Sequence, residues 1–221
     1  MINIGTLELA DAYVGNTPIE KAYIGSQLVW EKADEGFVEC NYIENTSTAY
    51  IDTGIANRGT SWSIDAVISV NEAKAGYIIG SRGASKYYQA IAVNATQNFF
   101  TRVNNTTVTY SDYTLGLNKK YHLVGTPKNL TITDEDDQSF TITNSGTFAS
   151  NGHNIAIFNL AAYVNAAQAF HGKIYSLKLY NSSGTLVRDY VPGKLNRQYG
   201  LMDIVDDVFY TSPNGVAFSG G

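Results

Sequence analysis

Residues His171 to Pro192 carry the pattern that most constrains the fold: two alternating runs joined by a short polar segment. On an extended chain the first run has two faces: Tyr175, Leu177 and Leu179 on one, and Ile174, Ser176, Lys178 and Tyr180 on the other. This period of two is typical of a half-buried strand. Because residues 181–184 have turn chemistry and Gly184 can take a positive φ, the segment predicts a β-hairpin. Pro192 has no N–H, so the second strand is expected to end there or to lie at an edge.

Similar runs, separated by turn signals at spacings of roughly ten residues, fill most of the preceding sequence. The predicted strands cover residues 62–70, 77–83, 87–93, 99–103, 121–125, 130–133, 140–143 and 155–158. The alanine-rich stretch 160–168 is the one place that suits a short helix. This organisation predicts an all-β fold, namely a two-sheet antiparallel jelly-roll sandwich.

The composition agrees with a β-rich surface protein. Apolar residues make up 44% of the chain, enough for a substantial core, whereas charged residues make up only 16%, and there are 16 tyrosines. The net charge of −5 and the lack of a Lys/Arg cluster argue against binding to nucleic acid. Cys40 is the single cysteine, so no intramolecular disulfide can form. No apolar run is long enough to insert into a membrane.

The N-terminal segment contains a repeat of ten residues. Ala12–Asn16 is echoed by Ala22–Ser26, and each copy reads as a short strand that ends at a glycine turn. We therefore expect residues 1–36 to form a small β-hairpin or meander with a linker at 31–36, and residues 37–221 to form the main domain. Two small strands bury too little surface to be stable alone.

The repeat can be interpreted in two ways. It is either an extra hairpin that packs on the main domain or an attachment element that docks on another protein. An exposed apolar patch on a soluble protein marks an interface, and the aromatic residues of the repeat, Tyr13, Tyr23 and Trp30, are the candidates for attachment.

Several phrases of the main domain occur together in a known family. They are residues 42–54, Gly172–Lys178, Leu186–Pro192, Gly200–Asp203, Phe209–Thr211 and Gly215–Gly220. In this order they resemble the concanavalin A-like (laminin G-like) jelly-roll domains of bacteriophage virion proteins, over about residues 37–221. The N-terminal repeat is similar to segments of phage tail proteins. Gly193 departs from the pattern, since many relatives have a cysteine after the proline.

The resemblance implies a structural protein of the virion, in the tail or decorating the capsid, with a lectin-like domain. Its implied partners are other virion proteins, further copies of the chain and a host-surface glycan. Residues 1–4 lack the basic start and apolar stretch of a secretion signal, so we expect synthesis in the bacterial host cytoplasm and a final location on the virion surface.

Glycan binding usually requires exposed aromatic rings that stack on sugar faces, with polar groups nearby for the hydroxyls. The candidates in predicted loops or strand ends are Tyr87, Tyr88, Tyr113 and Tyr163. The alternative for each is the ordinary use of tyrosine in strands.

The acidic run Asp134–Asp137 is the strongest metal candidate, with Asp134, Asp136 and Asp137 as possible calcium ligands. Laminin G-like domains often hold calcium near a loop rim. However, alternating runs on both sides predict a hairpin with a solvated tip, so we expect no bound metal and no cofactor. The histidines, His122, His153 and His171, lack metal-ligand spacing and are expected to be structural.

An enzymatic role is not expected. Glucanases with this type of sandwich place three acids on one strand, but here Glu135 and Asp137 are not followed by a third. A hydrolase would have to use dispersed acids such as Glu39, Glu44 and Asp65. Three functions therefore remain: a virion protein with a lectin-like domain, a purely structural virion component that binds protein, and a glycan hydrolase.

Overall fold

The computed structural model describes residues 12–14, 17–19, 21–24, 27–31, 36–83, 87–160 and 167–221, with side chains from residue 36 onward. The chain divides into two units, Met1–Gly36 and Phe37–Gly221. In the first unit β1 (Ala12–Val14) pairs with β2 (Thr17–Ile19), and β3 (Lys21–Ile24) pairs with β4 (Gln27–Glu31). Each copy of the repeat therefore opens a hairpin of its own.

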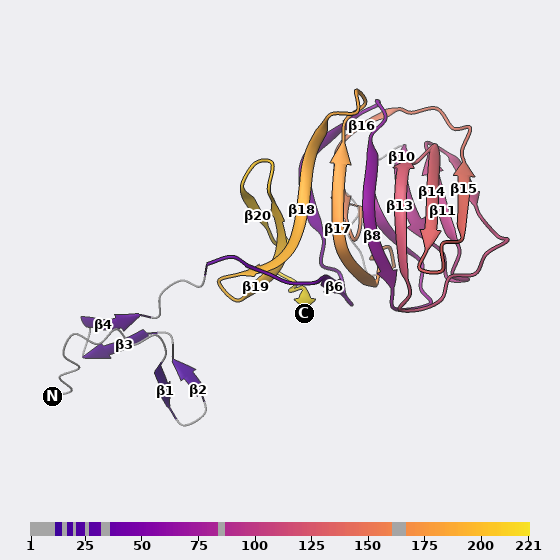
Figure 1. Ribbon diagram of the computed structural model, residues 1–221. Helices are drawn as coiled ribbons and strands as arrows, with labels where there is room; N and C mark the ends of the chain where they lie inside the picture. Colours follow the sequence, from indigo (N-terminus) through magenta and orange to yellow (C-terminus); the bar gives the residue numbers. More distant parts are fainter. Residues whose placement is uncertain are drawn as a thin grey trace. The chain divides into compact units, whose positions relative to one another are not determined.

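The second unit is built from two antiparallel sheets (Figure 1). The described residues of the smaller sheet form six strands in the order β12–β11–β10–β9–β16–β7. Their bounds are β7 (Ile51–Arg58), β9 (Gly76–Arg82), β10 (Tyr88–Val93), β11 (Phe99–Val103), β12 (Thr106–Thr109) and β16 (Ser150–Ile157). β7 and β12 have no counterpart among the predicted strand ranges.

The larger sheet has eleven strands within the described residues, and its main path runs β15–β14–β13–β8–β17–β18–β19–β20. β5 pairs with β18, and β6 pairs with both β17 and β21. Their bounds are β5 (Val38–Glu39), β6 (Ile43–Asn45), β8 (Ser63–Val70), β13 (Lys120–Thr126), β14 (Asn129–Asp134), β15 (Ser139–Thr143), β17 (Gly172–Tyr180), β18 (Leu186–Leu195), β19 (Gln198–Asp203), β20 (Val208–Tyr210) and β21 (Ser219–Gly220). The predicted all-β, two-sheet antiparallel sandwich is confirmed.

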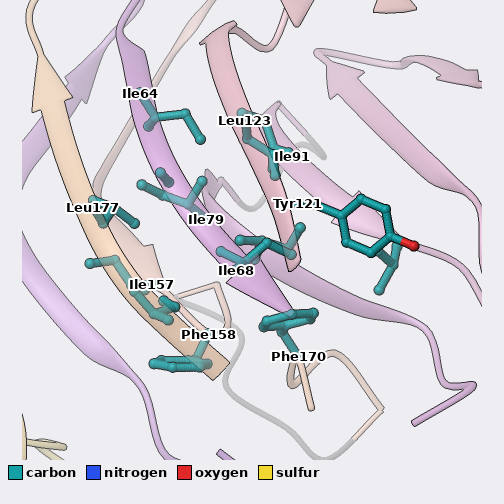
Figure 2. Packing of buried hydrophobic residues seen from close by; sticks show 14 of the residues in the cluster. Ile64, Ile68, Ile79, Ile91, Tyr121, Leu123, Ile157, Phe158, Phe170 and Leu177 are labelled. Atoms are coloured by element: carbon teal, nitrogen blue, oxygen red, sulfur yellow. The ribbon is translucent and has the colours of Figure 1, made fainter. Parts of the chain in front are cut away.

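The core fills the space between the two sheets. Ile64 and Ile68 of β8 and Leu123 of β13 face Ile79 of β9 and Ile91 of β10, all of them buried (Figure 2). Burying one such side chain stabilises the fold by about 1.5–3 kcal/mol. The alternation in these strands therefore identifies the side chains that pack between the two sheets.

The face assignment predicted for β17 is wrong at one point. The register of β17 against β8 shifts between Ile174 and Ser176, which is a β-bulge. Because a bulge inserts one extra residue, Ile174 and Leu177 are both fully buried although their spacing is odd. Tyr175 points to the solvent side of the sheet. It therefore does not share a face with the buried Leu177 and Leu179, although the alternation predicted that it would.

The hairpin between β17 and β18 is confirmed, but its second strand neither ends at Pro192 nor lies at an edge there, contrary to the expectation. Gly184 has a φ of 77°, as its place in the turn requires. β18 continues through Pro192, which lies opposite Leu201 of β19. The Pro192 carbonyl accepts a hydrogen bond from the Cys40 N–H at 3.0 Å. Since the N–H and C=O of one strand residue point to the same side, the missing N–H faces β5 and leaves the pairing with β19 intact.

The departure at Gly193 also has a physical reason. A Cβ at this position would lie 2.1 Å from the Phe37 ring and 2.9 Å from the Val38 carbonyl oxygen. A cysteine therefore does not fit beside Phe37. The Phe37 ring packs instead edge-on against Phe209, with 6.0 Å between ring centroids, so the start of the domain lies close to β20.

The short helix considered for residues 160–168 falls mostly on residues outside the description. Leu160 and residues 167–168, at its two ends, are not helical. Among the described residues, no helix has the length and apolar character that crossing a bilayer requires.

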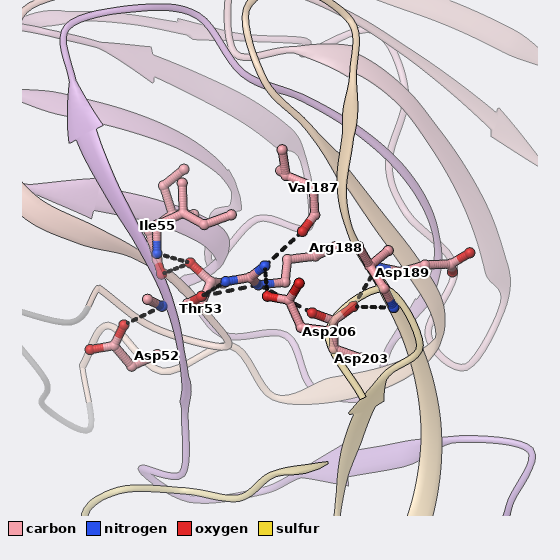
Figure 3. Close-up of polar contacts among 11 residues, drawn as sticks. Asp52, Thr53, Ile55, Val187, Arg188, Asp189, Asp203 and Asp206 are labelled. Atoms are coloured by element: carbon pink, nitrogen blue, oxygen red, sulfur yellow. Dashed lines mark hydrogen bonds and ion pairs between the residues drawn. The ribbon is translucent and has the colours of Figure 1, made fainter. Parts of the chain in front are cut away.

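Arg188 joins the two sheets (Figure 3). From β18 its Nε and Nη2 donate to the Thr53 carbonyl of β7, both at 3.3 Å. Its Nη1 donates to Asp206 at 2.5 Å, and its Nε lies 3.3 Å from Oδ2 of the fully buried Asp203. Oδ1 of Asp203 in turn accepts the backbone N–H groups of Asp189 and Val205 at 3.0 and 3.1 Å. Arg188 and Asp203 belong to the phrases that carry the family resemblance, and here they support the fold.

Asp203→Ala should destabilise the protein by ~3–5 kcal/mol, because it removes the buried carboxylate that pairs with Arg188 and leaves two N–H groups unbonded. Asp206→Ala is the matched control. It also removes a carboxylate from Arg188, but the Asp206 side chain is 47% exposed, so the cost should be below about 1 kcal/mol. Urea unfolding at neutral pH measures both values. Equal losses in the two variants would contradict this account.

Candidate functional site

The structure does not bring the four tyrosines predicted for glycan binding into one site. Tyr87 is 38% exposed and lies just before β10. Tyr88 is only 4% exposed, and the Arg102 guanidinium covers its ring with Cζ 3.7 Å from the centroid. The ring of Tyr88 is therefore not free to stack on a sugar in this conformation. Tyr163 lies outside the described residues.

Tyr113 is at the opposite end of the smaller sheet. Its carbonyl accepts a hydrogen bond from the Asn98 side chain, beside the start of β11, whereas Tyr88 lies beside the end of that strand. The Tyr113 ring packs on Phe140 with centroids 5.0 Å apart. Its hydroxyl donates to Asp134 at 2.5 Å, so both the ring and the hydroxyl have internal partners.

The acidic run is the predicted hairpin tip, but its first member is not solvated. Asp134 is 5% exposed, and its Oδ1 accepts the N–H groups of Asp136 and Gln138 at 3.0 and 2.9 Å. Asp136 pairs with Lys119 at 2.7 Å. Asp137 has a φ of 61°, which closes the turn. These contacts shape the turn. The expectation that the run holds no calcium stays a prediction.

No group of three His, Cys, Asp or Glu side chains placed for a metal occurs among the described residues. His122 pairs with Asp65 at 2.7 Å on the solvent side of the larger sheet. His171 lies between Glu72 at 2.5 Å and Lys74 at 2.9 Å. Of the dispersed acids, Asp65 is thus paired with His122, and Glu44 accepts a hydrogen bond from Asn71.

An aromatic platform that the sequence analysis missed lies on the solvent side of the larger sheet. The bulge in β17 turns Tyr175 outward, and Tyr42, just before β6, packs against it with ring centroids 5.7 Å apart. The Lys173 Nζ lies 4.0 Å from the Tyr42 centroid, and the Lys120 Nζ lies 4.4 Å from that of Tyr175. Both rings are half-exposed. We call this pair the Tyr42–Tyr175 platform.

A shallow pocket of about 420 Å³ adjoins the platform and is lined by Glu39, Cys40, Asn41 and Tyr175. The side chains of Glu39 and Asn41 are exposed. The backbone beneath them is held in place, because the N–H groups of Cys40 and Asn41 donate to the Pro192 and Gly221 carbonyls at 3.0 and 2.8 Å. Burial raises the pKa of the Cys40 thiol, which donates to the Tyr42 carbonyl, so the thiol is protonated at neutral pH.

The chemistry of this site suits a polyhydroxylated ligand. Aromatic faces stack on the C–H faces of a sugar, while an amide and a carboxylate donate to and accept from its hydroxyls. The lysine side chains are long and can move aside or bond to the ligand. Tyr42 and Tyr175 both stand in the phrases quoted for the family resemblance, but only the strand register reveals that they touch.

Comparison with protein-family models and with curated proteins gave no match. Among solved structures, the fold is similar to that of a candidate carbohydrate-binding protein from Bacteroides ovatus, with a TM-score of 0.54, 14% identity, 83% of this chain and 60% of that chain covered. Mouse laminin α1 domains LG4-5 match with a TM-score of 0.49 and 15% identity over 80% of this chain and 52% of that chain. This chain thus spans only part of either protein. The first likeness establishes the fold class, a jelly-roll domain of this general type, and nothing about the ligand.

Tyr113→Phe should weaken the protein by ~1.5–3 kcal/mol at pH 7, because it removes a hydrogen bond to a charged carboxylate. The Tyr113 hydroxyl and the backbone N–H groups lower the pKa of Asp134 below its usual value of 3.8. A lowered pKa gives stability that is present above the unfolded-state value and lost as the pH falls through the folded-state value. The difference between variant and wild type should therefore shrink as the pH falls below the usual carboxyl pKa of 3.8.

Tyr110→Phe is the control for this measurement. Tyr110 stacks on the same Phe140 ring with centroids 4.4 Å apart, but its hydroxyl has no hydrogen-bond partner among the described residues. Thermal unfolding of both variants from about pH 2 to pH 7 provides the comparison. A Tyr113→Phe deficit that stays constant over this range would show that Asp134 does not depend on Tyr113.

Proposed function

We propose that this protein is a non-enzymatic, lectin-like protein that binds a glycan at the Tyr42–Tyr175 platform. The observation that carries the proposal is the pair of half-exposed rings beside an open pocket with the exposed side chains of Glu39 and Asn41. Sugar sites combine stacking rings with a few polar groups in this way. The fold it shares with a candidate carbohydrate-binding protein is in keeping with this function.

We further propose that the protein is a bacteriophage virion component, placed on the particle surface, where it binds a host glycan or decorates the particle. The support is the family resemblance of residues 37–221 and of the repeat. Synthesis in the bacterial host cytoplasm and association with other virion proteins or further copies of the chain belong to the same proposal. A purely structural role and a glycan hydrolase are the alternatives that the experiments distinguish.

The N-terminal unit is the proposed attachment element. Its two hairpins each have only two strands, and isolated two-stranded hairpins are marginally stable in water. A partner surface would supply the missing burial. The aromatic residues proposed for attachment, Tyr13, Tyr23 and Trp30, stand in β1, β3 and β4.

Tyr175→Ala should weaken binding to the best ligand on a glycan array by at least about tenfold, because it removes the ring that faces the pocket. Tyr87→Ala is the matched control, since Tyr87 is an exposed tyrosine of the other sheet and should leave affinity unchanged. Titration calorimetry with full-length protein measures both, and thermal unfolding checks that each variant is folded. A loss of affinity in Tyr87→Ala and none in Tyr175→Ala would place the glycan site at Tyr87, a position that the sequence alone suggested.

Two further outcomes decide between the functions. If the wild-type protein binds no glycan on the array, the structural, protein-binding alternative is favoured. If it releases reducing sugar from a glycan that it binds, and Glu39→Gln abolishes that release, the protein is a hydrolase.

Deletion of residues 1–32 should leave a folded and soluble sandwich that no longer joins the particle. The reason is that the second unit contains the two-sheet core, whereas the first unit is the proposed anchor. Quantitative mass spectrometry of purified particles measures incorporation. Wild-type occupancy by the truncated chain would show that the anchor lies elsewhere.

A further inference from the structure

A second aromatic cluster lies on the face of the smaller sheet that points away from the main core, and Tyr77 and Tyr88 in it are buried. Tyr77 and Tyr88 stack with centroids 6.0 Å apart, and Phe100 packs edge-on against Tyr77 at 5.9 Å. The neighbours of these residues along the strands, such as Ile91 and Phe99, belong to the main core. The side chains of a strand alternate, so this cluster faces the other way.

Two arginines lie against one ring of this cluster. Arg102 Cζ is 3.7 Å from the Tyr88 centroid, and Arg82 Cζ is 5.0 Å from the same centroid. Arg82 lies opposite Tyr88 in the pairing of β9 with β10, and Arg102 comes from β11 on the other side. Both arginines are half-buried. Two guanidinium groups therefore lie beside one aromatic side chain.

Arg102 has no carboxylate within ion-pair distance in the part of the chain that the structure describes, and its buried Nε has no hydrogen-bond partner there. Burial raises the pKa of the Tyr77 hydroxyl, although Arg102 hydrogen-bonds to it, so the phenol stays neutral and supplies no counter-charge. The quadrupole of the Tyr88 ring offsets only about 0.5–2 kcal/mol of the cost of burying a cation.

Arg188 provides the contrast within the same molecule. It is also largely buried, and two carboxylates, those of Asp203 and Asp206, neutralise it. The chain has 20 acidic residues against 15 basic ones, so acids are available in number, yet none of the described ones approaches Arg102. A half-buried guanidinium without a counter-ion, beside a second one, is a place where an external anion is stabilised.

We propose that Arg102 and Arg82, held on the Tyr88 ring, bind an oxyanion of an acidic saccharide, either a carboxylate or a sulfate group. A guanidinium presents its N–H donors as a planar fork that matches the two oxygens of such a group. Thr107 lies opposite Arg102 on β12 and is exposed, so its hydroxyl is available to the same ligand. This site is on the other sheet from the Tyr42–Tyr175 platform and does not rest on the function proposed for it.

The test uses the full-length protein and three probes: an oligogalacturonate, a neutral galactan oligomer of the same length, and sodium sulfate. We expect the oligogalacturonate to bind and to weaken as salt is added, and the galactan not to bind at this site. Arg102→Gln should reduce oligogalacturonate affinity by at least about tenfold. Arg102→Lys keeps the charge but loses the planar fork of N–H donors, so its oligogalacturonate affinity should lie between those of the wild type and Arg102→Gln.

Arg58→Gln is the matched control, because Arg58 is an exposed arginine at the end of β7 in the same sheet. Equal losses in Arg58→Gln and Arg102→Gln would overturn the proposal, since general surface charge would explain the binding. Unchanged affinity in Arg102→Gln would overturn it as well. If sulfate binds as tightly as the oligogalacturonate, the site is one for free oxyanions. That result would overturn the proposal of a saccharide ligand.

Two measurements keep the test decisive. If Arg102→Gln does not fold, the wild-type melting temperature is measured with each probe. A rise with oligogalacturonate alone supports the proposal, and no rise with any probe contradicts it. In a Tyr175→Ala background, Arg102→Gln should still cause the same fold loss of oligogalacturonate affinity, so failure of the platform and failure of this site give different results.

Discussion

The structure depends above all on the register of β17, which has neighbours along both edges. One edge pairs with β8 along nearly the whole strand, and the other is shared by β6 and β18. The bulge after Ile174 lets both Ile174 and Leu177 reach the core while Tyr175 leaves it. Without the extra residue, the pattern of two would bury either Ile174 or Leu177 but not both. The burial of both Ile174 and Leu177 and the position of Tyr175 in the platform therefore follow from one irregularity.

Arg188 and Arg102 differ in how the protein balances their positive charges. Arg188 connects the two sheets, and the carboxylates of Asp203 and Asp206 balance its positive charge within the protein. Arg102 rests on an aromatic ring, which orients the guanidinium without neutralising it. The first arrangement is suited to holding a fold together. The second leaves an attraction for anions that is still available to a ligand.

Local features of the sequence predicted much of the fold. The alternation and turn residues located β8, β11 and the β17–β18 hairpin, and the positive φ of Gly184 was foreseen from its turn. Errors arose where pairing overrides local preference. β18 continues through Pro192 because the missing N–H faces away from β19, and β12 was missed because a four-residue edge strand carries little periodic signal.

The candidate sites were much harder to predict, because they join residues that are distant in sequence. Tyr42 meets Tyr175 only after β6 has paired with β17, and Tyr113 bonds to Asp134 at the end of β14, 21 residues along the chain. Tyr88 looked like an exposed ring from its neighbours in the sequence, yet arginines from two other strands cover it. A tyrosine in a β-protein can be a core residue, a hydrogen-bond donor or a binding surface, and the side chain alone is the same in each case. What separates these roles is the set of charged and aromatic groups that the sheet register brings alongside.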